Sequence, residues 1–267
     1  MDFNVLKRVD NHYQESKQYF PEDRIVGIFL QGSQNYGLQT PVSDVDTKLI
    51  VVPTFNEIAF NQKPQSTTHV RANNEHIDFK DLRLMLQTFR KQNLNFLEIL
   101  FTEYRFLNTL YQDEWGKLTR AREDITHYNL YLAVKAMRGI AYEKYYAMEH
   151  LYPSKVKIIE EYGYDPKQLH HLLRVSDYLD RYIAGEPYEQ CLRPSDPEML
   201  IAVKLGALDL DAARETADKT LEHINSICEP FTKDSKYNES NPKVDCLLDE
   251  VQYNIMKKAI SLELGGK

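Results

Sequence analysis

The segments that predict β-strands all lie in the first third of the chain. Residues 24–30 form a continuous β-prone apolar run, which is typical of a strand buried on both faces. Residues 44–53 (DVDTKLIVVP) begin with alternating acids and end at a proline, and residues 75–79 (EHIDF) form a third short segment. The sequence therefore predicts a small sheet near the N-terminus.

Helices are expected before and after these strands. The apolar residues of 3–20 fall near one helical stripe, which Pro21 ends. Asp81 is a good N-cap for residues 82–92, whose apolar side chains recur at helical spacing. Residues 54–68 are mostly polar and are expected to form a short helix or a loop.

Beyond residue 110 the pattern is helical. Helices are predicted over 128–148, 167–183, 209–227 and 245–264, and a further helix is predicted to begin at Ser195-Asp-Pro-Glu198. The predicted fold class is α+β, a small mixed sheet with flanking helices in residues 1–108 followed by an all-helical domain in residues 109–267. Two domains with separate cores fit a chain of 267 residues.

Composition restricts the classes of partner. The formal net charge of −7 argues against a protein that coats nucleic acid, so bulk DNA binding is not expected, but a local basic cleft for a nucleoside triphosphate is compatible with it. The three cysteines have no metal-ligand spacing, which favours a reduced, cytoplasmic setting. No apolar run reaches the ~18 residues of a membrane span, so no membrane partner is expected.

Three motifs with small or acidic side chains accompany the predicted strands in chain order: Gly32-Ser33, Asp44-Val45-Asp46 and Asp78. Side chains two apart on a strand share a face, so Asp44 and Asp46 are predicted to point together while Val45 packs into the opposite layer. Carboxylates this close raise one another's pKa unless cations neutralise them. The pattern therefore predicts a metal site.

Two Mg²⁺ ions suit such a site. Divalent ions ~3.5–4 Å apart neutralise paired carboxylates and clamp the attacking and leaving oxygens of a phosphoryl transfer. Mg²⁺ prefers carboxylate, water and phosphate oxygens, and Mn²⁺ is the alternative. Asp78, on its own strand, is the predicted third ligand. The Gly32-Ser33 turn can bring backbone N–H groups and a hydroxyl to phosphates without a blocking side chain.

The segment QGSQNYGLQTPVSDVDTKLIVV resembles the signature of the DNA polymerase beta-like nucleotidyltransferase superfamily, which is apolar-Gly-Ser, a spacer and Asp-apolar-Asp. Here the polar Gln31 stands directly before Gly32, a small variation on that signature. The form GSxxYG…SDxD is most similar to stand-alone predicted nucleotidyltransferases of bacteria and phages. The resemblance covers Ile25 to Phe79, and the helical half is similar to that group's C-terminal domain only in general pattern.

The resemblance implies an activity. It is Mg²⁺-dependent transfer of a nucleoside monophosphate from a nucleoside triphosphate, ATP included, to an acceptor hydroxyl, with release of pyrophosphate. Gly32 and Ser33 would bind the triphosphate, Asp44 and Asp46 would hold both ions, and Asp78 would hold the catalytic ion and help to activate the acceptor. Residues 1–108 would form the catalytic domain, and residues 109–267 would bind substrate or nucleotide.

Cationic side chains of the helical half are further candidates. His171 and Arg174 are three apart and therefore neighbours on a helix, and Lys135 lies on the preceding predicted helix. Members of the superfamily often use such residues to bind the triphosphate, so all three are predicted nucleotide ligands. The competing interpretation is an ordinary solvated cationic face.

Two residues near the motifs have structural interpretations instead. Lys48 shares the parity of Asp44 and Asp46, and a solvated or structural lysine is expected, with pairing to a carboxylate or phosphate as the alternative. Glu98 lies in an apolar run and is expected to be a buried acid with a local partner.

Other functions remain open at this point. The same fold can serve as a non-catalytic nucleotide-binding module or a toxin–antitoxin-type interaction module, and the same acids can serve a phosphohydrolase. The acceptor can be a small molecule, a protein or an RNA end. The base of the triphosphate, the oligomeric state, the pathway and contacts of the helical half with nucleic acid are not readable from the sequence.

Overall fold

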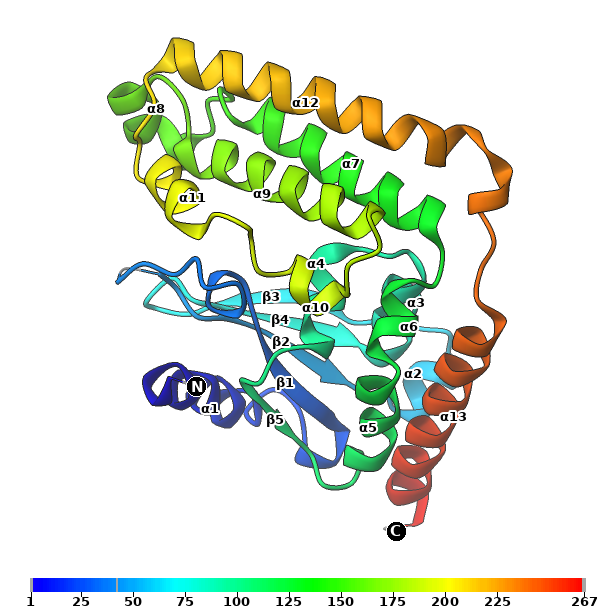
Figure 1. Ribbon diagram of the computed structural model, residues 1–267. Helices are drawn as coiled ribbons and strands as arrows, with labels where there is room; N and C mark the ends of the chain where they lie inside the picture. Colours follow the sequence, from blue (N-terminus) through cyan, green and yellow to red (C-terminus); the bar gives the residue numbers. More distant parts are fainter. Residues whose placement is uncertain (1, 42, 266–267) are drawn as a thin grey trace. The chain divides into compact units, whose positions relative to one another are not determined.

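The computed structural model describes residues 2–41 and 43–265 (Figure 1). They form two compact units. The sheet unit comprises the described parts of Met1–Asn35, Pro41–Tyr128 and Ser240–Lys267, and the helical unit comprises Tyr36–Thr40 and Asn129–Glu239. These units differ from the predicted division at residue 108, because residues 109–128 and the C-terminal helix lie with the sheet.

The sheet unit contains one five-stranded sheet of order β3-β4-β2-β1-β5. Its strands are β1 (Ile25–Gln31), β2 (Asp46–Val51), β3 (Ser66–Val70), β4 (His76–Asp81) and β5 (Arg105–Leu107). β2 and β4 run parallel, whereas β1 is antiparallel to β2 and β5, and β3 is antiparallel to β4. The sheet is therefore mixed, and the predicted α+β class is confirmed.

Two strands were not expected from the pattern. Residues 54–68, predicted as a short helix or a loop, contain helix α2 (Phe55–Ala59) and most of β3. β3 is a largely exposed strand with a polar sequence, so it lacks the apolar alternation that identifies a half-buried strand. β5 is only three residues long, below the length at which a pattern is recognisable.

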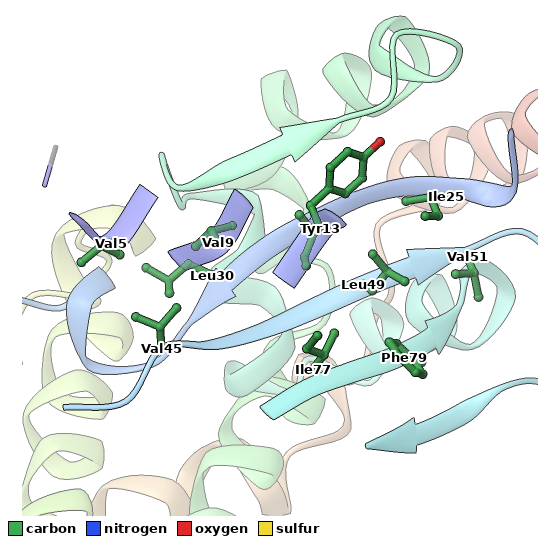
Figure 2. Close-up of a cluster of buried hydrophobic side chains, with 11 residues drawn as sticks. Val5, Val9, Tyr13, Ile25, Leu30, Val45, Leu49, Val51, Ile77 and Phe79 are labelled. Carbon is green, nitrogen blue, oxygen red and sulfur yellow. The ribbon is translucent and has the colours of Figure 1, made fainter. Parts of the chain in front are cut away.

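Helix α1 (Phe3–Ser16) covers one face of the sheet. Its residues Val5, Val9 and Tyr13 pack with buried side chains of β1, β2 and β4, as Figure 2 shows. These partners include Leu30, Leu49, Ile77 and Phe79, and Val45, directly before β2, belongs to the same cluster; all are drawn as sticks. The helix ends four residues earlier than predicted, and Phe20 packs against the same core from outside the helix.

The other helices of the sheet unit include α3 (Leu82–Arg90), α5 (Gln112–Arg120) and α13 (Pro242–Gly265). Trp115 of α5 packs on Phe29 of β1 with ring centroids 4.5 Å apart. Arg90 of α3 binds Asp245 of α13 at 2.8 Å. The predicted last helix therefore exists, but it packs against α3 and α5 (Figure 1). Shorter elements of the unit are α4 (Leu94–Leu97), α6 (Arg122–Thr126), η1 (Glu22–Arg24), η2 (Ser33–Asn35) and η3 (Glu98–Leu100).

The helical unit is built around α9 (Pro166–Ile183), which packs against four other helices. These are α7 (Leu130–Ala147), α10 (Tyr188–Cys191), α11 (Pro197–Lys204) and α12 (Leu210–Lys233), and the unit also contains α8 (Val156–Tyr162), η4 (Pro153–Lys155) and η5 (Ser235–Tyr237). Asparagine and aspartate side chains cap α7, α9, α11 and α12. No helix in the described part of the chain has both the length and the apolarity to cross a membrane.

Gly206 follows α11 in a conformation that only glycine adopts without strain. Its φ is +86°, and an added Cβ would lie 2.2 Å from Cε1 of Tyr162. We expect Gly206→Ala to destabilise the protein by about 1–3 kcal/mol, because the backbone strain persists even if Tyr162 moves aside. Thermal unfolding followed by circular dichroism measures the change.

Gly139 provides the matched control. It lies within α7, and apart from its chain neighbours and the adjoining helix backbone, no heavy atom of the described residues lies within 4 Å of the position that its Cβ would take. Gly139→Ala should stabilise the protein by up to about 1 kcal/mol, because alanine favours a helix. Equal midpoints for both variants would contradict the role assigned to Gly206.

Candidate active site

Four polar residues of β1, β2 and β4 share the sheet face that points away from α1. In the ladders, Gln31 lies opposite Asp46, and Lys48 lies opposite Asp78. The alternating residues Thr47, Leu49, Ile77 and Phe79 point into the core beneath α1 or are buried there. Because side chains alternate along a strand, Asp46, Lys48 and Asp78 belong to the other face.

The Asp44-Val45-Asp46 motif occupies the entrance to β2. Val45 is fully buried in the core, Asp44 is exposed, and Asp46 is half-buried, which is the alternation predicted for this tripeptide. The backbone N–H of His76 donates to Asp46 Oδ1 at 2.8 Å. The Asp44 carbonyl accepts a hydrogen bond of 2.6 Å from Gln34 Nε2. The motif is therefore tied both to the neighbouring strand and to the turn after β1.

Asp78 is surrounded by donors from three strands. Its Oδ1 accepts from the Thr68 hydroxyl at 2.6 Å, and its Oδ2 accepts from Gln31 Nε2 at 3.2 Å. Lys48 Nζ lies 3.4 Å from the same Oδ2. Burial alone raises the pKa of Asp78, but the Thr68 hydrogen bond and the Lys48 charge outweigh it, so the pKa lies below its ordinary value. Asp78 is therefore ionised at neutral pH.

Lys48 is a buried lysine whose ammonium lies beside Asp78. It is 3% exposed, it also donates to Gln31 Oε1, and its Nζ lies 4.3 Å from the centroid of the Phe96 ring. Burial lowers its pKa, and the negative charge of Asp78 acts in the opposite direction. Lys48 is therefore paired with the carboxylate of Asp78, which was the alternative to a solvated lysine.

The turn after β1 depends on Gly32. Its φ is +96°, a conformation that favours glycine, and apart from Gly32 and its two chain neighbours, no heavy atom of the described residues lies within 4 Å of the position that a Cβ would take. Its N–H donates to Oε1 of the buried Glu98 at 3.1 Å, which confirms that Glu98 is a buried acid with a local partner. Ser33 begins η2 directly afterwards. The Gly32 N–H therefore already has a carboxylate acceptor.

The three predicted nucleotide ligands of the helical unit have different surroundings. Lys135 is exposed on α7, with Nζ 5.4 Å from the Tyr131 ring centroid. Arg174 of α9 is buried, and its guanidinium lies 4.1 Å from the Tyr36 ring centroid. Burial is the main cause that lowers the pKa of His171 well below its usual value, and the charge of Arg174 lowers it further. His171 is therefore neutral at pH 7 and supplies no positive charge.

Two site residues were missed by reasoning from sequence alone. Gln31 bridges Lys48 and Asp78, and Thr68 binds Asp78. In the sequence, Gln31 stands out only as a variation on the motif. Thr68 lies in a segment that was not predicted as a strand, so no pattern placed it opposite Asp78. Within residues 2–41 and 43–265, no group of three or more His, Cys, Asp or Glu side chains is arranged to hold a metal ion.

Comparisons with known proteins find likenesses among solved structures. No model of a known protein family matches the sequence, and no curated protein matches it. Among solved structures, the chain is similar to a nucleotidyltransferase-like protein from Exiguobacterium sibiricum, with 15% identity and a TM-score of 0.33 over 87% of this chain and 78% of that chain. A likeness at this level carries no argument about activity.

Proposed function

We propose that this protein is a Mg²⁺-dependent nucleotidyltransferase, which transfers a nucleoside monophosphate from a nucleoside triphosphate to an acceptor hydroxyl and releases pyrophosphate. One observation carries the proposal. Asp46 and Asp78 lie on neighbouring parallel strands on one face of the sheet, next to Gln31, which directly precedes the open turn at Gly32. The motif resemblance over Ile25 to Phe79 supports the same activity.

The donor chemistry of the site fits Mg²⁺. Asp44 is exposed and Asp46 half-buried, so both carboxylates can reach a cation that takes its other oxygens from phosphate and water. When bound, the metal would polarise the α-phosphate and neutralise charge on the departing pyrophosphate. Asp78 can serve as a third ligand, but its Oδ2 is engaged by Lys48. For a site that holds two Mg²⁺ ions, as predicted, the Lys48 ammonium must therefore move away from Asp78.

The protein's own groups would position the substrates. The space at Gly32 leaves room for phosphate oxygens beside the Ser33 hydroxyl. Asp78 offers a fixed negative charge that can accept a hydrogen bond from the acceptor hydroxyl. Lys135 and Arg174 are proposed to bind the triphosphate through their charges, whereas a neutral His171 would contribute only a hydrogen bond. Most of the rate enhancement would come from positioning and electrostatics.

Nucleotide binding is the first test. Trp115 is the only tryptophan and is fully buried in the sheet unit, so its fluorescence reports on unfolding of that unit. A triphosphate with Mg²⁺ at a hundred-fold excess over its dissociation constant should stabilise the protein by roughly 2.7 kcal/mol. The same triphosphate with EDTA is the control. No shift with any of the four triphosphates would contradict the proposal and favour a pure interaction module.

The reaction itself is tested with α-labelled triphosphates and Mg²⁺ in a cell lysate. Label that enters protein, RNA or a small molecule identifies the acceptor class. Release of labelled monophosphate without any labelled acceptor would contradict nucleotidyl transfer and indicate a phosphohydrolase.

A further inference from the structure

We infer that Glu75 is a positioning residue, which fixes the backbone of the Asp44-Val45-Asp46 motif from the sheet face opposite the acids. This inference rests on the proposed function, because it assigns Glu75 a role toward the acids of that site. The carboxylate of Glu75 is 1% exposed and accepts a hydrogen bond of 3.3 Å from the Val45 N–H. Val45 is the residue between the two proposed metal ligands.

The position of Glu75 explains why it reaches Val45. Glu75 directly precedes β4 and has the same parity as Ile77 and Phe79, so its side chain lies on the α1 side of the sheet. Val45 is buried in the same layer. Val45 also precedes the first residue of β2, so no β-ladder bond holds its N–H. The carboxylate supplies the acceptor that a ladder would otherwise provide.

Glu75 is itself held by charged groups from two directions. Arg8 of α1 donates to Oε1 through Nε at 2.7 Å, and Arg71 donates to Oε2 at 2.7 Å. His12 of α1 contacts Oε2 at 3.0 Å through Nε2. A buried carboxylate is costly without such partners. With them, its position is determined by α1 and by the segment between β3 and β4.

The network reaches the motif at a second point. Nδ1 of the fully buried His12 lies 2.9 Å from Oγ1 of Thr47, the residue that follows Asp46. Both links lie on the covered face, whereas the acids face the other way. The Glu75 cluster, defined as Arg8, His12, Arg71 and Glu75, therefore holds the motif on both sides of Asp46 without occupying the site.

A cluster that serves stability alone would have no effect on metal binding once the protein is folded. Removing a group that orients metal ligands typically weakens metal binding or activity by about 10- to 100-fold. We therefore expect Glu75→Gln to weaken Mn²⁺ binding in the presence of triphosphate by about 10- to 100-fold, measured by electron paramagnetic resonance. The Val45 amide should exchange with deuterium about tenfold faster, measured by NMR at equal global stability.

Glu15→Gln is the matched control. Glu15 accepts from Arg71 at 2.8 Å, as Glu75 does, but its other partner is His69 at 2.9 Å. This variant perturbs the same arginine and should leave Mn²⁺ affinity and Val45 exchange within twofold of wild type. If Glu75→Gln does not fold, Thr47→Val removes the His12 link alone and should weaken Mn²⁺ binding at least threefold.

The two hypotheses fail in different ways. Equal Mn²⁺ affinity and equal Val45 exchange in wild type and E75Q, with T47V also unchanged, would overturn the role of Glu75 only. Equal losses in E75Q and E15Q would also overturn it, because a general loss of stability would then explain both. Absence of triphosphate-dependent Mn²⁺ binding by the wild-type protein would overturn the proposed function itself.

Discussion

Asp46→Asn should lower the rate of nucleotidyl transfer by about a thousandfold or more while leaving the fold intact. The amide has the shape of the carboxylate and can still accept the hydrogen bond from the His76 N–H at 2.8 Å. It lacks the negative charge that would hold a divalent cation, and that charge is the contribution that the proposed mechanism requires. The measurement is kcat/KM with an α-labelled triphosphate once the acceptor is known.

The control for this prediction is an acid away from the site. Asp113 is exposed in the first turn of α5, and Asp113→Asn should leave the rate within twofold of wild type. The unfolding midpoint of Asp46→Asn, followed by Trp115 fluorescence, should stay close to that of wild type. Turnover by Asp46→Asn near the wild-type rate would exclude Asp46 as a metal ligand.

Acid should lower the free energy of unfolding in part because Glu75 becomes protonated. Comparison of the wild-type protein with E75Q isolates this contribution. The partners of Glu75 overcome its burial and lower its pKa from 4.5 to about 2. Because the folded pKa is depressed, the stabilisation is fully present above the unfolded pKa of about 4.5 and is lost as the pH falls toward 2. The pKa difference corresponds to roughly 3 kcal/mol.

Urea unfolding followed by Trp115 fluorescence, at a series of pH values from 7 to 3, measures this effect. Asp78 and Glu15 also have lowered pKa values, so the wild-type curve alone is not specific for Glu75. The difference in unfolding free energy between wild type and E75Q should be constant above about pH 5.5 and should shrink below it. Parallel curves over the whole range would show that Glu75 has an ordinary pKa.

Local patterns in the sequence were sufficient for the longest helices and for three of the strands. The apolar run of 24–30 became β1 (Ile25–Gln31), and residues 167–183 became α9 (Pro166–Ile183), each within about one residue. Such elements are predictable because their hydrophobic period and their capping side chains are properties of consecutive residues. β3 was not predicted, because an exposed polar strand is stabilised by its partner β4 and has no period of its own.

The candidate acids could also be selected from the sequence, since Asp44, Asp46 and Asp78 lie at recognisable positions beside predicted strands. The groups that surround these acids could not be predicted from the sequence. The Lys48–Asp78 pair and the bond from Thr68 depend on which strands are neighbours and in which register. The parallel pairing of β2 and β4 joins residues 30 positions apart, and sequence spacing alone does not specify such a pairing.

The sequence by itself determined three of the five strands, the α+β class, the acids that are candidates for chemistry and the helices α1, α3, α7, α9, α11, α12 and α13. Only the tertiary structure decided that α13 packs with α3 and α5, that Lys48 is buried against Asp78, and that Glu75 reaches the Val45 N–H. The physical reason is the range of the interactions. Periodicity and capping act within a few residues, whereas burial and ion pairing depend on groups that come together only when the chain has folded.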